Sequence, residues 1–325
     1  MAKAVDPPTL ALGIDDLVDW LELTALFDEY GVARVDALLG ALLELQETAE
    51  DDIAERDRQR EQLIERLENE VLLRQRSLEG AYPFELSQSG EELSIDADWR
   101  RPEFAFYLVC LITSHVTGSA ILRTPPTDEL LARLRNDIFQ IVATLGLAGY
   151  SAGPAFSVGW PRQTGETIVQ LLSRAVAAGG GFDVRTPPGR YVSPHEKDGG
   201  VDVIAWTAEA VPPPSAFYFG QTASGKNWPS KPVRDHANTF GQAYMQDHMT
   251  GNRLYFTLIP FRVLDDAFWH SQNQFHMGIL DRLRLPARAL QGVRLAEQGT
   301  LVDNSDRLGD LTRWLDDFVV YAQAA

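Results

Sequence analysis

The chain of 325 residues is long enough for about two domains, and its 45% hydrophobic and 23% charged residues are ordinary for a globular protein. A single cysteine, Cys110, excludes an internal disulfide framework and argues against a zinc site built on cysteines. No stretch approaches the roughly 18 uninterrupted apolar residues of a membrane span, and the first ten residues lack the pattern of a secretory signal. We therefore expect a soluble, cytoplasmic protein with no membrane partner.

The net charge of -17 is concentrated in one half of the chain. Residues 1–150 hold 13 of the 29 Lys and Arg but 29 of the 46 Asp and Glu. A field of that sign repels phosphate, so we expect any contact with DNA to be local and to lie on the C-terminal half.

The first elements in chain order are predicted helices. Apolar residues recur at helical spacing over 15–30, and Gly31 is a suitable stop. Residues 34–78 are rich in Glu, Gln and Arg, and their later part places apolar residues at heptad-like spacing, interrupted at Arg74. This pattern predicts a long charged helix packed as a hairpin or a short coiled coil. Its outer face is either simply solvated or an arm for a protein partner or for self-association.

Alternating patterns near 82–87 and 92–96 predict two short strands, and helices are predicted over 103–116 and 128–147, the second capped by Thr127. Residues 149–165 are rich in Gly and Pro, which is typical of a boundary. The sequence thus predicts an acidic, mainly helical domain over 1–150 and an α/β domain over 151–325.

The second half alternates between helical and strand patterns. Helices are predicted over 164–178, 234–249, 265–283 and 307–322, and apolar strands over 200–206, 216–222 and 253–261. This order predicts an α+β or α/β fold in which helices flank a mixed β-sheet, with the strands 200–206 and 216–222 adjacent.

Two polar residues stand at the ends of those adjacent strands. Asp202 interrupts an apolar run directly after two glycines, and Gln221 ends the next apolar run. A buried carboxylate is costly unless it is paired or binds a metal. Neighbouring strand ends can bring the two side chains together, and their oxygens suit a hard divalent cation. Lys226 and Lys231 follow in the next loop, where either could stabilise developing negative charge.

The segment Asp198-Gly-Gly-Val-Asp202 and the following strand ending in Gln221 resemble the PD-(D/E)XK nuclease superfamily, in particular the Mrr-like restriction endonucleases. The resemblance covers roughly residues 160–262. It implies a restriction-endonuclease-like mixed sheet flanked by helices, and a Mg²⁺ or Mn²⁺ ion held by Asp202, Gln221 and Asp198. It also implies a further carboxylate from the preceding helix, for which Glu166 is in the right order.

The chain departs from that family's pattern at one position. The residue two places after Gln221 is Ala223, where the family has a lysine. Either Lys231, which we favour, or Lys226 replaces it from the following loop, or the site does not cut. Each candidate also has a structural interpretation: Asp202 or Asp198 can form a turn, Gln221 can satisfy backbone groups, Glu166 can interact with a helix N-terminus, and the lysines can be surface charges.

Two functions follow from this pattern. The first is a metal-dependent DNA endonuclease that hydrolyses phosphodiesters, as the effector of a bacterial restriction or antiphage defence system. The second is a catalytically inactive, nuclease-like subunit that binds DNA or acts as a scaffold in a multiprotein complex. No P-loop and no Gly-x-Ser-x-Gly elbow occurs in the sequence to support a nucleotide-hydrolysing enzyme or a serine hydrolase.

Overall fold

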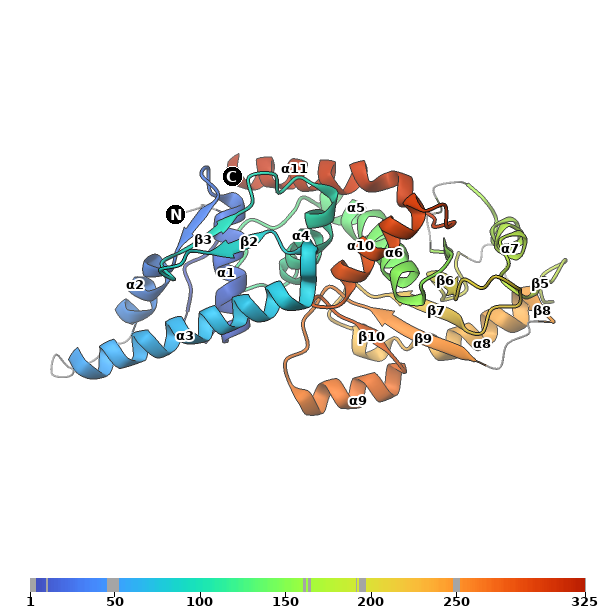
Figure 1. Ribbon diagram of the computed structural model, residues 1–325, viewed down its shortest axis with the longest axis horizontal. Helices are drawn as coiled ribbons and strands as arrows, with labels where there is room; N and C mark the ends of the chain where they lie inside the picture. Colours follow the sequence, from blue (N-terminus) through green and yellow to red (C-terminus); the bar gives the residue numbers. More distant parts are fainter. Residues whose placement is uncertain are drawn as a thin grey trace. The chain divides into compact units, whose positions relative to one another are not determined.

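The computed structural model describes residues 4–9, 11–45, 53–159, 162, 165–190, 192, 197–247 and 252–324, and it has a mixed α+β fold (Figure 1). The chain divides into two compact units: Met1–Leu131 with Thr312–Ala325, and Ala132–Leu311. The sequence suggests a boundary near residue 150, whereas this division assigns residues 132–150 to the second unit. Among the described residues, no helix combines the length and hydrophobicity needed to cross a bilayer.

The first unit combines helices with a small antiparallel sheet, whose strand order is β1-β3-β2. Its strands are β1 (Val32–Arg34), β2 (Phe84–Leu86) and β3 (Glu92–Ile95). Its helices are α1 (Ile14–Phe27), α2 (Val35–Leu45), α3 (Ile53–Leu78), the 3-10 turn η1 (Glu79–Ala81), α4 (Pro102–His115), most of α5 (Asp128–Arg133) and most of α11 (Leu308–Ala324).

The predicted helix over 34–78 corresponds to two helices, α2 and α3, and residues 46–52 between them lie outside the described part of the chain. Its heptad-like seam is interrupted at Arg74 for a structural reason. The Arg74 side chain is fully buried and contacts four carboxylates, at 2.6 to 2.9 Å: Asp15, Asp19, Glu22 and Glu70. A buried guanidinium needs such partners. Arg74 therefore joins α3 to α1 inside the first unit.

The second unit contains a five-stranded mixed sheet in the order β10-β9-β7-β6-β4. Its strands are β4 (Ala155–Ser157), β6 (Val203–Trp206), β7 (Phe217–Thr222), β9 (Arg253–Leu258) and β10 (Ile279–Leu280). The pairs β4–β6 and β6–β7 are antiparallel, and β7–β9 and β9–β10 are parallel. The predicted adjacency of the strands 200–206 and 216–222 is confirmed, with Val203 opposite Gly220.

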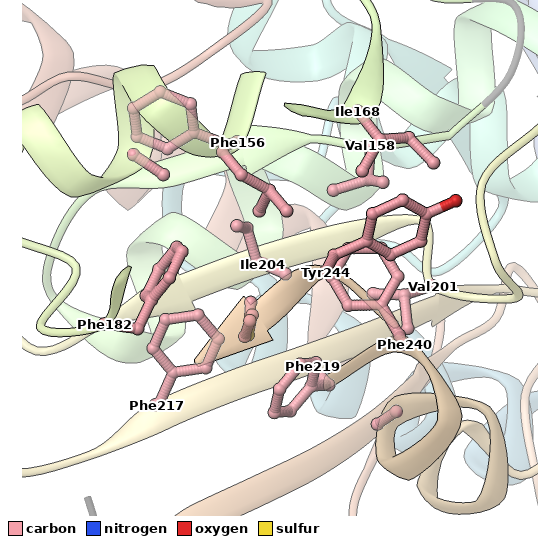
Figure 2. Close-up of a cluster of buried hydrophobic side chains, with 14 of the residues drawn as sticks. Phe156, Val158, Ile168, Phe182, Val201, Ile204, Phe217, Phe219, Phe240 and Tyr244 are labelled. Atoms are coloured by element: carbon pink, nitrogen blue, oxygen red, sulfur yellow. The ribbon is translucent and has the colours of Figure 1, made fainter. Parts of the chain in front are cut away.

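Helices cover the sheet, and alternate residues of β7 face different helices. These helices are the π-helical turn η2 (Leu134–Ile138), α6 (Phe139–Ser151), α7 (Ile168–Ala177), α8 (Val233–Tyr244), α9 (Asp266–His276) and α10 (Leu285–Glu297). A Cβ on Gly220 would lie 3.0 Å from Leu147 of α6. Phe217 and Phe219 belong instead to the apolar core with Phe240 of α8 (Figure 2). Because side chains alternate along a strand, Gln221 lies on the α8 face.

Several short elements escape the sequence patterns. β4 lies within the expected boundary segment, and a small sheet pairs β5 (Asp183–Val184) with β8 (Met245–Gln246). The remaining 3-10 turns are η3 (Trp228–Ser230) and η4 (Ser305–Arg307). The predicted helix over 265–283 ends at His276, because Met277 adopts a left-handed conformation with φ of +69°. Gly278 then passes so close to Phe256 that a Cβ would lie 2.6 Å from its ring. Residues 164 and 248–249, at the ends of two predicted helices, lie outside the described residues.

Candidate active site

Asp202 and Gln221 meet at the ends of two adjacent antiparallel strands. The Asp202 backbone N–H donates to the Gly220 carbonyl at 2.9 Å, which extends the β6–β7 ladder to this residue. The Gln221 side-chain amide donates to Asp202 Oδ2 at 2.6 Å. The backbone N–H of Thr222 donates to the same oxygen at 2.7 Å. The structure therefore brings together the two residues that the strand patterns single out.

The glycines before Asp202 form a turn that brings the chain close to α8. Gly199 and Gly200 have φ angles of +63° and +76°, a region that favours glycine. The Asp198 carboxylate accepts a hydrogen bond from the Gly200 N–H at 2.8 Å. A Cβ on Gly200 would lie 2.5 Å from the His236 ring. Asp198 thus forms the turn, as one of its two interpretations predicts, and it stays near enough to Asp202 to influence its charge.

The environment of Asp202 disfavours its ionised form. Burial raises the pKa of Asp202 to about 7, and the negative charge of Asp198 acts in the same direction. The Thr222 N–H and the positive charge of Lys231 lower the pKa and only partly offset the burial. A carboxyl group with a strongly perturbed pKa is a common feature of functional sites, and a cation beside it would restore the carboxylate.

Gln140, on α6, holds the strand ends in place and was not predicted as a site residue. Its amide nitrogen donates to the Asp202 carbonyl at 2.8 Å and to the Ser157 hydroxyl at 3.1 Å. Its amide oxygen accepts from the Thr222 hydroxyl at 2.9 Å. One side chain therefore ties α6 to residues at the ends of β4, β6 and β7. The sequence feature that could have identified Gln140 is its position as a polar residue inside the apolar run Ile138-Phe-Gln-Ile-Val142.

Glu166 lies just before the N-cap of α7, where it pairs with an arginine. Its carboxylate accepts from Arg174 at 2.9 and 3.0 Å, and Arg174 also pairs with Asp303 at 2.9 Å. Arg174 and Asp303 line a cavity of about 370 Å³ together with Gln140 and Ser157. The donors to the Asp202 carboxylate are Gln221 and Thr222, whereas Glu166 pairs with Arg174, so the role of Glu166 as a further metal ligand stays a prediction.

Ala223 occupies the position where the resembled family has a lysine, and its side chain is in an apolar environment. It is 1% exposed, and it packs with Trp228, Ile259 and Ile279. A lysine there would bury an ammonium group among apolar side chains, which is costly. The position is therefore suited to the small apolar residue that occupies it.

The loop after Ala223 carries both candidate lysines and is held by Trp228. The Trp228 ring is buried, and it contacts the rings of Phe268 and His276 with centroids 6.0 and 5.4 Å apart. The Lys231 N–H then donates to the Trp228 carbonyl at 3.0 Å. Of the two lysines, Lys231 is the one whose charge acts on Asp202, whereas Lys226 precedes η3.

Comparisons with known proteins do not assign this arrangement to a family. The chain matches no family model, no curated protein and no solved structure. The geometry of the second unit is therefore the basis for a functional interpretation.

The donor atoms at the strand ends are of the type that magnesium prefers. Asp202 and Asp198 offer carboxylate oxygens, and Gln221 offers its amide oxygen once the amide group turns over from its hydrogen bond with Asp202. Asp202 Oδ1 accepts no hydrogen bond from the described residues, so it is available to a ligand. A magnesium ion needs few protein ligands because it retains several waters.

A second group of carboxylates occurs in the first unit. Among the described residues, Asp15, Asp16 and Asp19 place three oxygens within 4.8 Å of one another. Two of these residues already pair with the buried Arg74, at 2.6 Å in each case. The guanidinium supplies the positive charge there, so this group differs from the strand-end site and has an evident structural role.

Proposed function

We propose that the second unit is a metal-dependent DNA endonuclease, with Asp202 as its central residue. The observation that carries the proposal is the 2.6 Å contact between Asp202 and Gln221 at the ends of adjacent strands of a helix-flanked mixed sheet. This is the pairing that the resemblance to the PD-(D/E)XK superfamily implies. The glycine turn before Asp202 and the raised pKa of its carboxyl group support the same interpretation.

In this proposal Asp202, Gln221 and Asp198 hold a Mg²⁺ ion. When bound, the ion supplies charge stabilisation and a water molecule of lowered pKa. Thr222 orients the Asp202 carboxylate through its backbone N–H, and Gln140 fixes the backbone carbonyl of the same residue. Lys231, whose positive charge acts on Asp202, would stabilise the negative charge that develops on the phosphate.

A specific observation favours a second candidate, a DNA-binding or scaffolding subunit without nuclease activity. Glu166 is engaged by Arg174, and an alanine replaces the family's lysine. Asp202 and Asp198 are then the carboxylates that remain at the strand ends, fewer than the resemblance implies. Loss of activity with retention of the fold is a common outcome in superfamilies, because function resides in a few side chains.

Plasmid nicking separates the two candidates. Supercoiled and single-stranded DNA are incubated with the full chain in Mg²⁺, in Mn²⁺ and in EDTA. The nuclease proposal predicts nicking that requires the cation and that falls more in Lys231→Ala than in Lys226→Ala. Absence of cation-dependent cleavage of either DNA form, together with DNA binding by the same preparation, would favour the inactive subunit.

A further inference from the structure

The second unit contains another cavity, which lies beside the Gly199–Gly200 turn and therefore close to the proposed catalytic site. Its volume is about 440 Å³, within the usual range for small-molecule sites. Its walls come from residues between 185 and 192 that the structure describes, from the last two turns of α8, and from Gly199. The described lining residues are Arg185, Gly189, Arg190, Val192, Gly199, Thr239, Phe240, Gln242, Ala243 and Tyr244.

The wall of this cavity is held to the C-terminal end of α8 by hydrogen bonds. The Arg185 N–H donates to the Tyr244 carbonyl at 2.8 Å, and the Gly189 N–H donates to the Ala243 carbonyl at 2.7 Å. The Arg185 side chain donates to the Gln242 carbonyl at 2.8 Å. The last carbonyls of a helix have no partner within it, so these donors satisfy them. The cavity is thus formed by fixed backbone on two sides.

The lining combines cations with an apolar surface and includes no described carboxylate. Arg185 and Arg190 are exposed at the cavity. Within the described part of the chain, the Arg185 guanidinium makes a single hydrogen bond, which leaves N–H groups for a ligand. Arg185 differs in this respect from Arg174 and Arg307 of the same unit, which pair with carboxylates. Exposed guanidinium groups bind phosphate through two parallel hydrogen bonds and stack on nucleobases.

The apolar part of the lining belongs to the side chains that anchor α8. Phe240 and Tyr244 pack beside Val201, which precedes β6, with their rings near one another (Figure 2). Val192 packs against the same core. A ligand with a flat apolar part and a phosphate would match both halves of the lining. A nucleotide has this composition.

The cavity also lies close to the proposed catalytic centre. Gly199 lines it, and Asp202 follows three residues later, a separation of at most about 11 Å between their Cα atoms. Gln221 lies on the α8 face of the sheet, where the cavity is also formed.

We propose that this cavity holds one nucleotide of a DNA strand, with its phosphate on Arg185 and Arg190 and its base against the apolar wall. This inference rests on the proposed nuclease function, because it names how that site positions its substrate. It predicts that the protein prefers strands in which a base is free to leave the stack: single strands and duplexes with unpaired bases.

Binding without cleavage tests the inference independently of catalysis. Fluorescence anisotropy of a labelled short single strand is measured in EDTA at fixed salt. The variants are Arg185→Ala with Arg190→Ala, and Thr239→Trp, which fills the cavity and keeps both charges. Arg234→Ala, on the same helix but outside the lining, is the matched control. Circular dichroism and unfolding midpoints establish that each variant is folded.

We expect the double variant to weaken binding of the single strand by about tenfold or more, since charge-assisted hydrogen bonds contribute affinity of that order, and Thr239→Trp to weaken it similarly because the indole occupies the space of the base. Arg234→Ala changes it little. Equal affinity of the wild type and both cavity variants would overturn the inference, even if Asp202→Ala abolishes nicking. A deoxynucleoside monophosphate that binds the wild type but fails to compete with the strand would also overturn it, by indicating a separate site for free nucleotide.

Discussion

Gln140 donates a hydrogen bond to the backbone carbonyl of Asp202 at 2.8 Å, although 62 residues separate the two in the chain. The same side chain accepts from the Thr222 hydroxyl. Because α6 begins at Phe139, the helix delivers this amide directly to the ends of three strands. The position of the Asp202 carboxylate therefore depends on a residue outside the segment that carries the motif.

The first prediction follows from this contact. Gln140→Ala should lower the free energy of unfolding by about 2 kcal/mol, because it removes three hydrogen bonds in a half-buried place: those with the Asp202 carbonyl, the Ser157 hydroxyl and the Thr222 hydroxyl. Urea unfolding monitored by circular dichroism measures the change. Gln291→Ala, which removes a side-chain hydrogen bond with Arg288 on α10, is the control. A loss no greater than that of the control would contradict the proposed role of Gln140.

The strand-end part of the site follows from the sequence for a clear physical reason. Asp202 lies just before β6 and Gln221 near the end of β7, and in an antiparallel pair the start of one strand lies beside the end of the next. Gln140 could not be found in this way, because its partners are set by how α6 packs on the sheet. The burial of Ala223 could not be predicted from the sequence either, because it depends on packing against Ile279, which lies 56 residues later in the chain.

The fold class follows from the alternating helix and strand patterns, but the short elements do not. β4 has three residues within a segment rich in Gly and Pro, and β10 has two, so neither contains enough alternation to be recognised. α10 was missed although α6 packs against it. The close approach depends on Gly149 and Gly292, where a Cβ would lie about 2 Å from backbone carbonyls of the other helix. Such packing can be predicted only when the positions of both helices are known.

The second prediction concerns pH. The pKa of Asp202 is raised from 3.8 to about 7 in the folded protein, so the stability associated with its protonated form is present below about pH 4 and lost as pH rises to 7. Asp202→Asn does not titrate and keeps an oxygen that accepts from Gln221 and Thr222. In EDTA, the melting temperature of Asp202→Asn relative to wild type should therefore rise between pH 5 and pH 8.

Differential scanning fluorimetry at the two pH values measures this difference, with Asp235→Asn on the exposed side of α8 as the control. A difference between Asp202→Asn and wild type that does not change with pH would show that Asp202 is not held in a protonated form.

The third prediction concerns the turn before Asp202. Gly200→Ala should destabilise the protein by about 2 kcal/mol or more, because a Cβ would lie 2.5 Å from the His236 ring and φ is +76°. Gly179→Ala is a matched control: its φ is +88°, but nothing lies within 4 Å of the added Cβ. Chemical denaturation should find Gly200→Ala the more destabilised of the two. Equal destabilisation would mean that backbone strain alone governs this turn.

The fourth prediction concerns the first unit. Arg74→Ala should cost about 3 to 5 kcal/mol of stability, since it leaves buried carboxylates of α1 without their cation. Arg76→Ala, two residues later on the exposed side of α3, should change stability by less than about 0.5 kcal/mol. Guanidinium chloride unfolding compares the two. Similar unfolding midpoints for both variants would contradict a central role for Arg74.

The central claim is that Asp202 is a ligand for a catalytic cation, and the rate of plasmid nicking in Mg²⁺ tests it most directly. The assay compares wild type, Asp202→Ala and the exposed control Asp235→Ala at equal concentrations of folded protein. We predict that Asp202→Ala lowers the rate by roughly a thousandfold, because loss of the cation removes several kcal/mol of transition-state stabilisation, and that Asp235→Ala nicks like the wild type. Equal rates for wild type and Asp202→Ala would contradict the claim.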